Sequence, residues 1–110
     1  MSDESDLEKA RPVCLREHIQ YAAGAVVSKT LVNRKTGTIT LFAFDAGQGL
    51  SEHTAPFDAV VQVLEGQAEI TIDGKVSQVS AGQMIVMPAN APHALMAAQP
   101  FKMLLTMIRS

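Results

Sequence analysis

The chain has 110 residues, of which 47% are hydrophobic and 18% are charged, and its formal net charge at pH 7 is -2. A chain of this length can bury a real core as one domain, and its hydrophobic content excludes an intrinsically disordered protein. The small negative charge gives no electrostatic attraction to nucleic acid or to an anionic membrane. No apolar run approaches the roughly 20 residues of a membrane span, so we expect neither nucleic acid nor a membrane as a partner.

The N-terminal region carries few structural signals. Its first six residues, MSDESD, are acidic and polar, unlike a secretory signal peptide, which favours a cytoplasmic location. Cys14 is the only cysteine, so no internal disulfide can form. We expect residues 1–24 to be an N-terminal extension, partly disordered or lying at an edge of the domain. Residues 15–21 are expected to form a short helical turn or an edge segment.

A strand pattern begins after Gly24. Residues 25–32 are rich in β-branched side chains and end at Asn33, which predicts a strand. Residues 37–44 predict a second strand with apolar side chains on both faces. Such a strand is typical of a position between two layers.

The centre of the chain predicts three strands in succession. Residues 59–65 have the apolar composition of a buried strand, and residues 68–72 alternate between apolar and polar side chains as a half-exposed strand does. Asp73-Gly74 favours a type I′ hairpin turn, because both central positions of that turn need a positive φ. Residues 75–79 are then the return strand.

Three further strands are predicted near the C-terminus. Residues 84–87 form a short apolar run that ends at Pro88, and residues 94–97 and 101–108 supply the last two strands. Short strands at regular spacing, separated by turn signals, indicate an all-β protein of the jelly-roll or barrel type. We expect residues 25–110 to form this single domain.

Two histidines stand at regular distances from glycines and a proline. His53 follows Gly47 with five residues between them. Pro88 follows Gly82 with five residues between them, and His93 comes five residues after Pro88. Glycine and proline suit the corners where one strand gives way to the next, since glycine admits a positive φ and proline ends ladder pairing.

Gly66 lies 13 residues after His53 and completes a spacing that resembles the two motifs of the cupin superfamily, over residues 47–97. The pattern is similar to that of small, single-domain, RmlC-like cupins of the conserved-barrel type. The resemblance implies an antiparallel jelly-roll β-barrel, a metal ion in the barrel mouth of many members, and a homodimer. It carries over two candidate ligands, His53 and His93.

The two motifs are degenerate in this chain. Ala55 stands where the family usually has a second histidine, and Ala59 stands where it usually has a glutamate. In the second motif, Asn90 replaces the usual glycine and Ala97 replaces the usual closing asparagine. An alanine side chain cannot coordinate a metal ion, so two of four expected ligands are absent.

The first hypothesis for the site is one divalent metal ion (zinc, iron, nickel or manganese) on His53 and His93. Imidazole is a common ligand for such metals, but a catalytic centre normally takes three protein ligands. The nearby candidates for the third are Gln48, Glu52, Asp58 and Gln62. Asp58 lies beside the missing glutamate, but strand alternation turns it to the opposite face unless a bulge near residues 56–57 intervenes. We favour a site with no tightly bound metal.

The second hypothesis is a small apolar pocket with two polar groups, the imidazoles of His53 and His93. Strand alternation places Ala59 and Val61 on the side of the missing glutamate, and Leu95 on the side of His93. The predicted pocket residues are His53, Ala55, Ala59, Val61, His93 and Leu95. Such a pocket suits a small, largely apolar molecule that His53 and His93 orient by hydrogen bonds, or on which one of them acts as a general acid or base.

Three functions therefore compete, and whether the protein is an enzyme stays open. We favour a module that binds a small molecule in the barrel mouth. A metal-dependent enzyme of the dioxygenase, isomerase or decarboxylase type is the second, and a dimeric interaction module with a vestigial pocket is the third. We expect a homodimer, because residues 25–32 form an apolar edge that needs a partner. A sedimentation mass of one chain would contradict the dimer.

Overall fold

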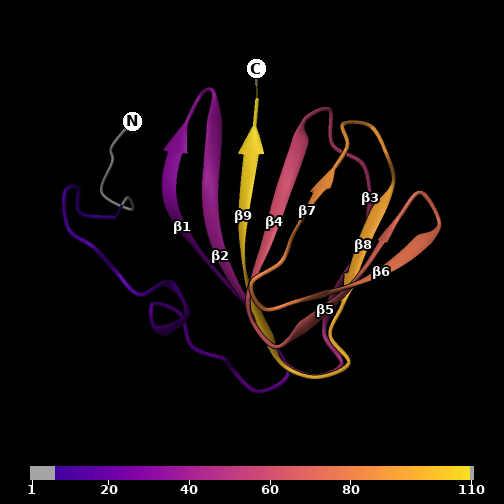
Figure 1. Ribbon diagram of the computed structural model, residues 1–110, viewed down its shortest axis with the longest axis horizontal. Coiled ribbons are helices and arrows are strands. Elements are labelled where there is room, and N and C mark those ends of the chain that lie inside the picture. The colour runs from indigo at the N-terminus through magenta and orange to yellow at the C-terminus, as the bar shows by residue number, and fades with distance from the viewer. Residues whose placement is uncertain (1–6, 110) are drawn as a thin grey trace.

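The computed structural model describes residues 7–109 as an all-β jelly roll of antiparallel strands (Figure 1). A single turn of 3-10 helix, η1 (Leu15–Glu17), precedes the strands. The strands are β1 (Val26–Arg34), β2 (Gly37–Phe44), β3 (Gly49–His53), β4 (Asp58–Glu65), β5 (Gln67–Ile72), β6 (Lys75–Ser80), β7 (Met84–Met87), β8 (His93–Met96) and β9 (Phe101–Ile108). No helix in the described part of the chain has the length and apolar character needed to cross a membrane.

The strands form two sheets that face each other. One sheet has five strands in the order β1-β2-β9-β4-β7, and the other has four in the order β3-β8-β5-β6. Figure 1 shows the strands converging at the lower end of the view and fanning apart at the upper end. β1 and β7 are the edge strands of the larger sheet, while β4 is paired on both sides.

Most of the predicted strands are confirmed. β2, β7 and β9 have the predicted bounds, and β1, β4, β5, β6 and β8 differ from them by one or two residues. Asp73 and Gly74 have φ values of 52° and 80°, so the predicted hairpin turn with two positive φ angles is confirmed. β3 was not predicted, because three of its five residues are exposed and polar and give no apolar alternation.

The main core lies between the two sheets. Its two largest side chains, Phe44 and Phe101, are fully buried and stack with ring centroids 4.4 Å apart. Ile70, Val61 and Val63 are also fully buried in this core. Inward-facing residues of both sheets thus supply the apolar area whose burial stabilises the fold.

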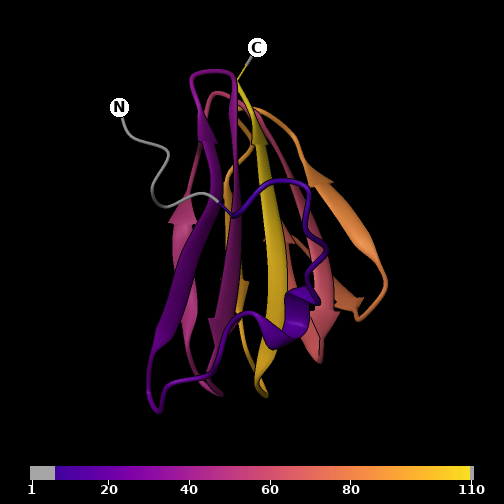
Figure 2. The ribbon, with the colours of Figure 1, turned by 90° about the vertical axis from the view of Figure 1, so that its left-hand side faces the viewer.

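A second apolar cluster covers the outer face of the five-stranded sheet. Ile19 packs there with Leu41 and Ala43 of β2. Figure 2 shows the N-terminal segment, with its helical turn, lying across that face of the sheet. Apolar residues on both faces of β2 are therefore buried, as predicted for a strand between two layers. Of the predicted extension, residues 1–6 lie outside the described residues.

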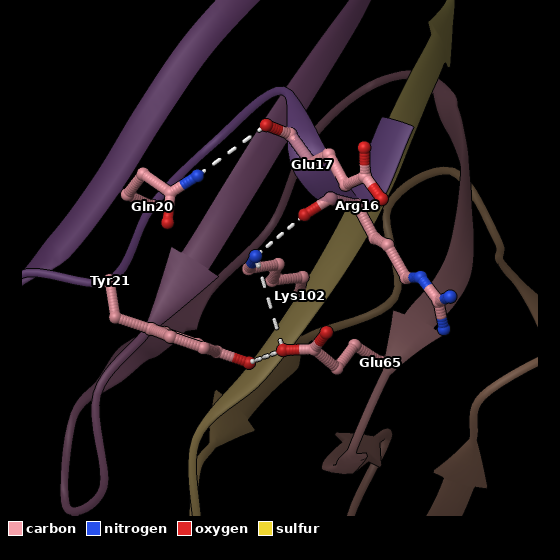
Figure 3. Close-up of polar contacts among 6 residues, drawn as sticks. All are labelled: Arg16, Glu17, Gln20, Tyr21, Glu65 and Lys102. Carbon is pink, nitrogen blue, oxygen red and sulfur yellow. Dashed lines mark hydrogen bonds and ion pairs between the residues drawn. The ribbon is translucent and has the colours of Figure 1, made fainter. Parts of the chain in front are cut away.

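A buried lysine ties this segment to the sheet (Figure 3). Lys102 of β9 is only 6% exposed, and its Nζ donates a hydrogen bond to the backbone oxygen of Arg16 at 2.6 Å. The same Nζ lies 5.0 Å from the ring centroid of Tyr21 and 3.9 Å from Oε2 of Glu65. The Tyr21 hydroxyl donates to that carboxylate oxygen at 2.6 Å. These contacts compensate the buried charge, since an unpaired one would be strongly destabilising.

The Tyr21 contact predicts a loss of stability at high pH. Burial, followed by the hydrogen bond and the charge of Glu65, raises the pKa of Tyr21 far above its ordinary value. The protonated hydroxyl therefore stabilises the folded state below about pH 10, and this contribution is lost as the pH rises further. Tyr21→Phe should cost stability near neutral pH, and its difference from the wild type should shrink in alkali.

Urea unfolding of both proteins at about pH 8 and about pH 11 measures this difference. Tyr21 is the only tyrosine, so subtracting the two proteins isolates its contribution. A free-energy difference that stays constant between the two pH values would contradict the prediction.

Candidate functional site

The two candidate histidines lie side by side at the ends of neighbouring strands. β3 ends at His53 and β8 begins at His93, and the two residues are register partners. Their rings meet edge to face, with centroids 4.3 Å apart, and their Nε2 atoms are 3.1 Å apart. His93 is only 5% exposed, whereas His53 is exposed. His93 therefore lies at the boundary of the core, and His53 beside it is accessible to solvent.

Backbone carbonyls fix the orientation of both rings. Nδ1 of His53 donates to the oxygen of Ser51 at 2.8 Å, and Nδ1 of His93 donates to the oxygen of Ala91 at 3.1 Å. A carbonyl oxygen only accepts, so each Nδ1 carries a hydrogen and each Nε2 of a neutral ring keeps its lone pair. The two Nε2 atoms are 3.1 Å apart, so a hydrogen on either of them is hydrogen-bonded to the other ring.

A cavity of about 120 Å³ extends from the histidines toward the core. Five of the six predicted pocket residues line it, namely His53, Ala55, Ala59, His93 and Leu95. Two larger surface cavities, of about 430 and 510 Å³, are lined by neither His53 nor His93. The small cavity is the candidate site, because the polar groups converge there.

Val61, the sixth predicted pocket residue, does not line this cavity. Its side chain lies on the same face of β4 as Ala59, as predicted, but it is fully buried in the core between the sheets. It lies two residues further along β4 than Ala59, which is about 7 Å deeper at the usual rise of a strand. Strand alternation predicts the face of a side chain but not its depth.

Five cavity residues were not predicted as pocket residues. They are Leu50, Met87, Met103, Leu105 and Met107. Ala59 is the register partner of Met87 on β7 and of Met107 on β9, so two long thioether side chains flank its methyl group. Met87 and Met107 are inward-facing residues of two apolar strands, which strand alternation in the sequence can indicate. Only the strand pairing shows that both are neighbours of Ala59.

The proposed third metal ligand is not brought to the histidines. β4 pairs without irregularity from Asp58 to Val63, so Asp58 faces away from the side of Ala59. Oδ1 of Asp58 accepts a hydrogen bond from the backbone amide of Ala89 at 2.9 Å. In residues 7–109, no group of three or more His, Cys, Asp or Glu side chains is placed to hold a metal ion.

The donor set therefore does not fit the metal centre that the cupin resemblance implies. His53 and His93 fill two coordination positions, and the positions of the usual second histidine and glutamate hold methyl groups. A catalytic metal centre with nitrogen and oxygen ligands normally has three protein ligands. Glu52, the other nearby carboxylate, is exposed on β3.

Solved structures with the same fold include proteins closely similar in sequence. A conserved protein of unknown function from Streptococcus pyogenes is 42% identical, with 96% of this chain and 92% of that chain covered and a TM-score of 0.90. A cupin superfamily protein from Desulfitobacterium hafniense is 28% identical, with 96% of both chains covered and a TM-score of 0.89.

A cupin 2 conserved barrel domain protein from Leptotrichia buccalis is 41% identical, with a TM-score of 0.83; the alignment covers 86% of this chain and 46% of that chain. No curated protein matches the sequence. The sequence profile of the family described as "Cupin domain" matches residues 40–108, which is more than half of the chain. Sequence profile, strand order and solved relatives agree: this chain belongs to the cupin domain family.

Proposed function

We propose that this cupin-domain protein binds a small, largely apolar molecule in the barrel mouth, with His53 and His93 as the polar contacts. One observation carries the proposal: both imidazoles line a cavity whose other lining residues are alanine, leucine and methionine. An apolar wall with a few convergent polar groups is the usual character of a small-molecule site. The missing ligands at positions 55 and 59 favour binding over metal-dependent catalysis.

The size of the cavity limits the ligand. At about 120 Å³, it is comparable to the apolar cavity of about 150 Å³ in an engineered protein that accepts benzene. The ligand should therefore have about one six-membered ring or an equivalent branched chain. Because His53 is exposed and His93 is buried beside it, a polar group on the ligand can reach the histidine pair from the solvent side.

A thermal-shift experiment with single-ring probes tests the proposal. Phenol and benzoate carry a polar group, and benzene is the matched probe without one. A ligand that binds only the folded state raises the free energy of unfolding, by about 2.7 kcal/mol at 100 times its Kd. We expect phenol or benzoate to raise the Tm more than benzene does, because only the first two can bond to His53 and His93.

A variant that fills the cavity provides the control. Ala59→Leu adds three carbons to a residue that lines the cavity, so it should abolish the ligand-induced shift. Val60→Leu places its extra carbon on the opposite face of β4 and should keep the shift. The proposal fails if no probe shifts the Tm of the wild type, or if Ala59→Leu retains the full shift.

A further inference from the structure

We propose a second ligand site, on the outer face of the four-stranded sheet, that takes a small primary ammonium compound with a short aliphatic chain. The site is the surface cavity of about 430 Å³, a volume within the usual range of small-molecule pockets. Six of its lining residues alternate with core-facing residues of β3, β5 and β8 and therefore face outward, namely Gly49, Ser51, Glu69, Thr71, Ala94 and Met96. The proposal goes beyond binding in the barrel mouth and does not depend on it.

The four-stranded sheet separates this outer cavity from the barrel mouth. Leu50 and Leu95 line both cavities, since a single layer of strands divides the two. The N-terminal segment lies on the other side of the molecule, against the five-stranded sheet (Figure 1). Met96, in the wall of the outer cavity, is 44% exposed, so a ligand can reach this face of the sheet from solvent.

Small residues form the floor of the outer cavity. Ala94 lies on β8, the strand between β3 and β5, and contributes only a methyl group. Gly49 on β3 contributes no side chain, and a Cβ there would collide with the backbone oxygen of Leu95. The close pairing of β3 with β8 therefore excludes a larger residue at position 49, and this part of the floor stays low.

Polar side chains stand on both sides of that floor. Glu69 and Thr71 of β5 are the register partners of Met96 and Ala94, so they form one wall. Ser51 of β3 belongs to the opposite wall. Neighbouring strands are about 4.7–4.9 Å apart, so β3 and β5 are separated by about 9.5 Å. The cavity is thus a trough across β8, with a carboxylate and a hydroxyl on one side and a second hydroxyl on the other.

The charge of the trough favours a cation. Glu69 is half-buried, and none of the other residues lining the trough is ionisable. Its Oε1 accepts a long hydrogen bond of 3.4 Å from Nε2 of Gln78, a neutral group. Within residues 7–109, no lysine or arginine forms an ion pair with Glu69. The carboxylate is therefore available to a positively charged ligand, and no basic group in the trough opposes that ligand.

A primary ammonium group matches these acceptors. It has three N–H donors and no acceptor, while Glu69 and Thr71 offer carboxylate and hydroxyl oxygens two residues apart on the same face of β5. Hydrogen bonds between charged partners are the stronger ones. An aliphatic chain would then lie over Ala94 and against the adaptable thioether of Met96. The width of two strand spacings suits a chain of about four carbons.

Titration of the isotope-labelled full chain with n-butylammonium, followed by the NMR shifts of backbone amides, tests the proposal. The matched probes are n-butanol, which has a similar shape without the charge, and butyrate, which has the opposite charge. We expect saturable shifts at residues 49–51, 69–71 and 94–96. Butylammonium should bind at least about fivefold more tightly than butanol, because a hydrogen bond to a charged group contributes more than a neutral one. Butyrate should not bind.

Three variants separate the site from a general effect of charge. Glu69→Gln keeps the shape of the side chain and should weaken butylammonium binding by at least about fivefold, while butanol binding is unchanged. Ala94→Leu raises the floor and should abolish the binding of both probes. Glu17→Gln removes the same charge from an exposed residue of η1 and should have no effect. The dispersion of the amide spectrum verifies the fold of each variant.

Three results would each overturn the inference: no saturable shifts at these strands, equal affinity for butylammonium and butanol, or equal losses in Glu69→Gln and Glu17→Gln. Ala59→Leu distinguishes this inference from the proposed function. It fills the barrel mouth and should leave butylammonium binding unchanged. If it abolished that binding, the ammonium compound would lie in the barrel mouth, which would refute the outer site without contradicting the proposed function.

Discussion

Replacing Ala59 with glutamate is expected to convert the barrel mouth into a site for a divalent metal ion such as zinc or iron(II). Ala59 lines the cavity together with His53 and His93, and its side chain is directed inward from β4. A glutamate there would add the carboxylate that the cupin pattern usually supplies, and two histidines with one carboxylate form a facial triad for non-haem iron.

The metal-free Ala59→Glu protein should be less stable than the wild type, because burying a polar group without a partner costs about 1–3 kcal/mol and a charge costs more. Zinc should restore the loss, since a ligand that binds only the folded state stabilises it. The Tm measured with a chelator and with zinc tests both points. In the matched control Val60→Glu, the carboxylate is on the outer face of the sheet and zinc should have no effect. A zinc-induced shift of equal size in both variants would refute the prediction.

Phe101→Ala should lose about 3–5 kcal/mol of unfolding free energy, the usual cost of deleting a buried aromatic ring. Phe101 is fully buried and stacks on Phe44 with an interplanar angle of 11°. Phe44 lies on β2 and Phe101 on the neighbouring β9, where they are register partners, so the stack supports the centre of the five-stranded sheet.

Urea unfolding of Phe101→Ala, of Phe44→Ala and of the double variant measures this stack. The double-mutant cycle should give a coupling of about 0.5–1.5 kcal/mol, the range for aromatic pairs. Phe57→Ala is the control. Phe57 lies in the loop before β4, and Cζ of Arg109 lies 5.8 Å from the centroid of its ring. This substitution should cost about 1 kcal/mol or less. A loss at Phe101 no larger than the loss at Phe57 would show that the stack is not the centre of the core.

Local signals in the sequence were enough for most of the strands. The bounds of β2, β7 and β9 could be predicted to the residue, because glycine or proline lies at or beside an end of each strand and most of their residues are apolar. β3 had no such signal, because Ser51, Glu52 and His53 are polar and exposed. Its pairing with β8 is a long-range contact that no local pattern expresses.

The sequence by itself determined the cupin fold and singled out the two histidines of the candidate site, since motif spacing and strand periodicity are properties of short segments. Only the tertiary structure decided which other residues line the cavity beside these histidines. Val61 is buried deep in the core, Asp58 faces away from the cavity, and Met87 and Met107 flank Ala59. All three features depend on the register between strands that are distant in the chain. Periodicity predicts which face a side chain takes, but its neighbours and its depth are set by how the strands pair.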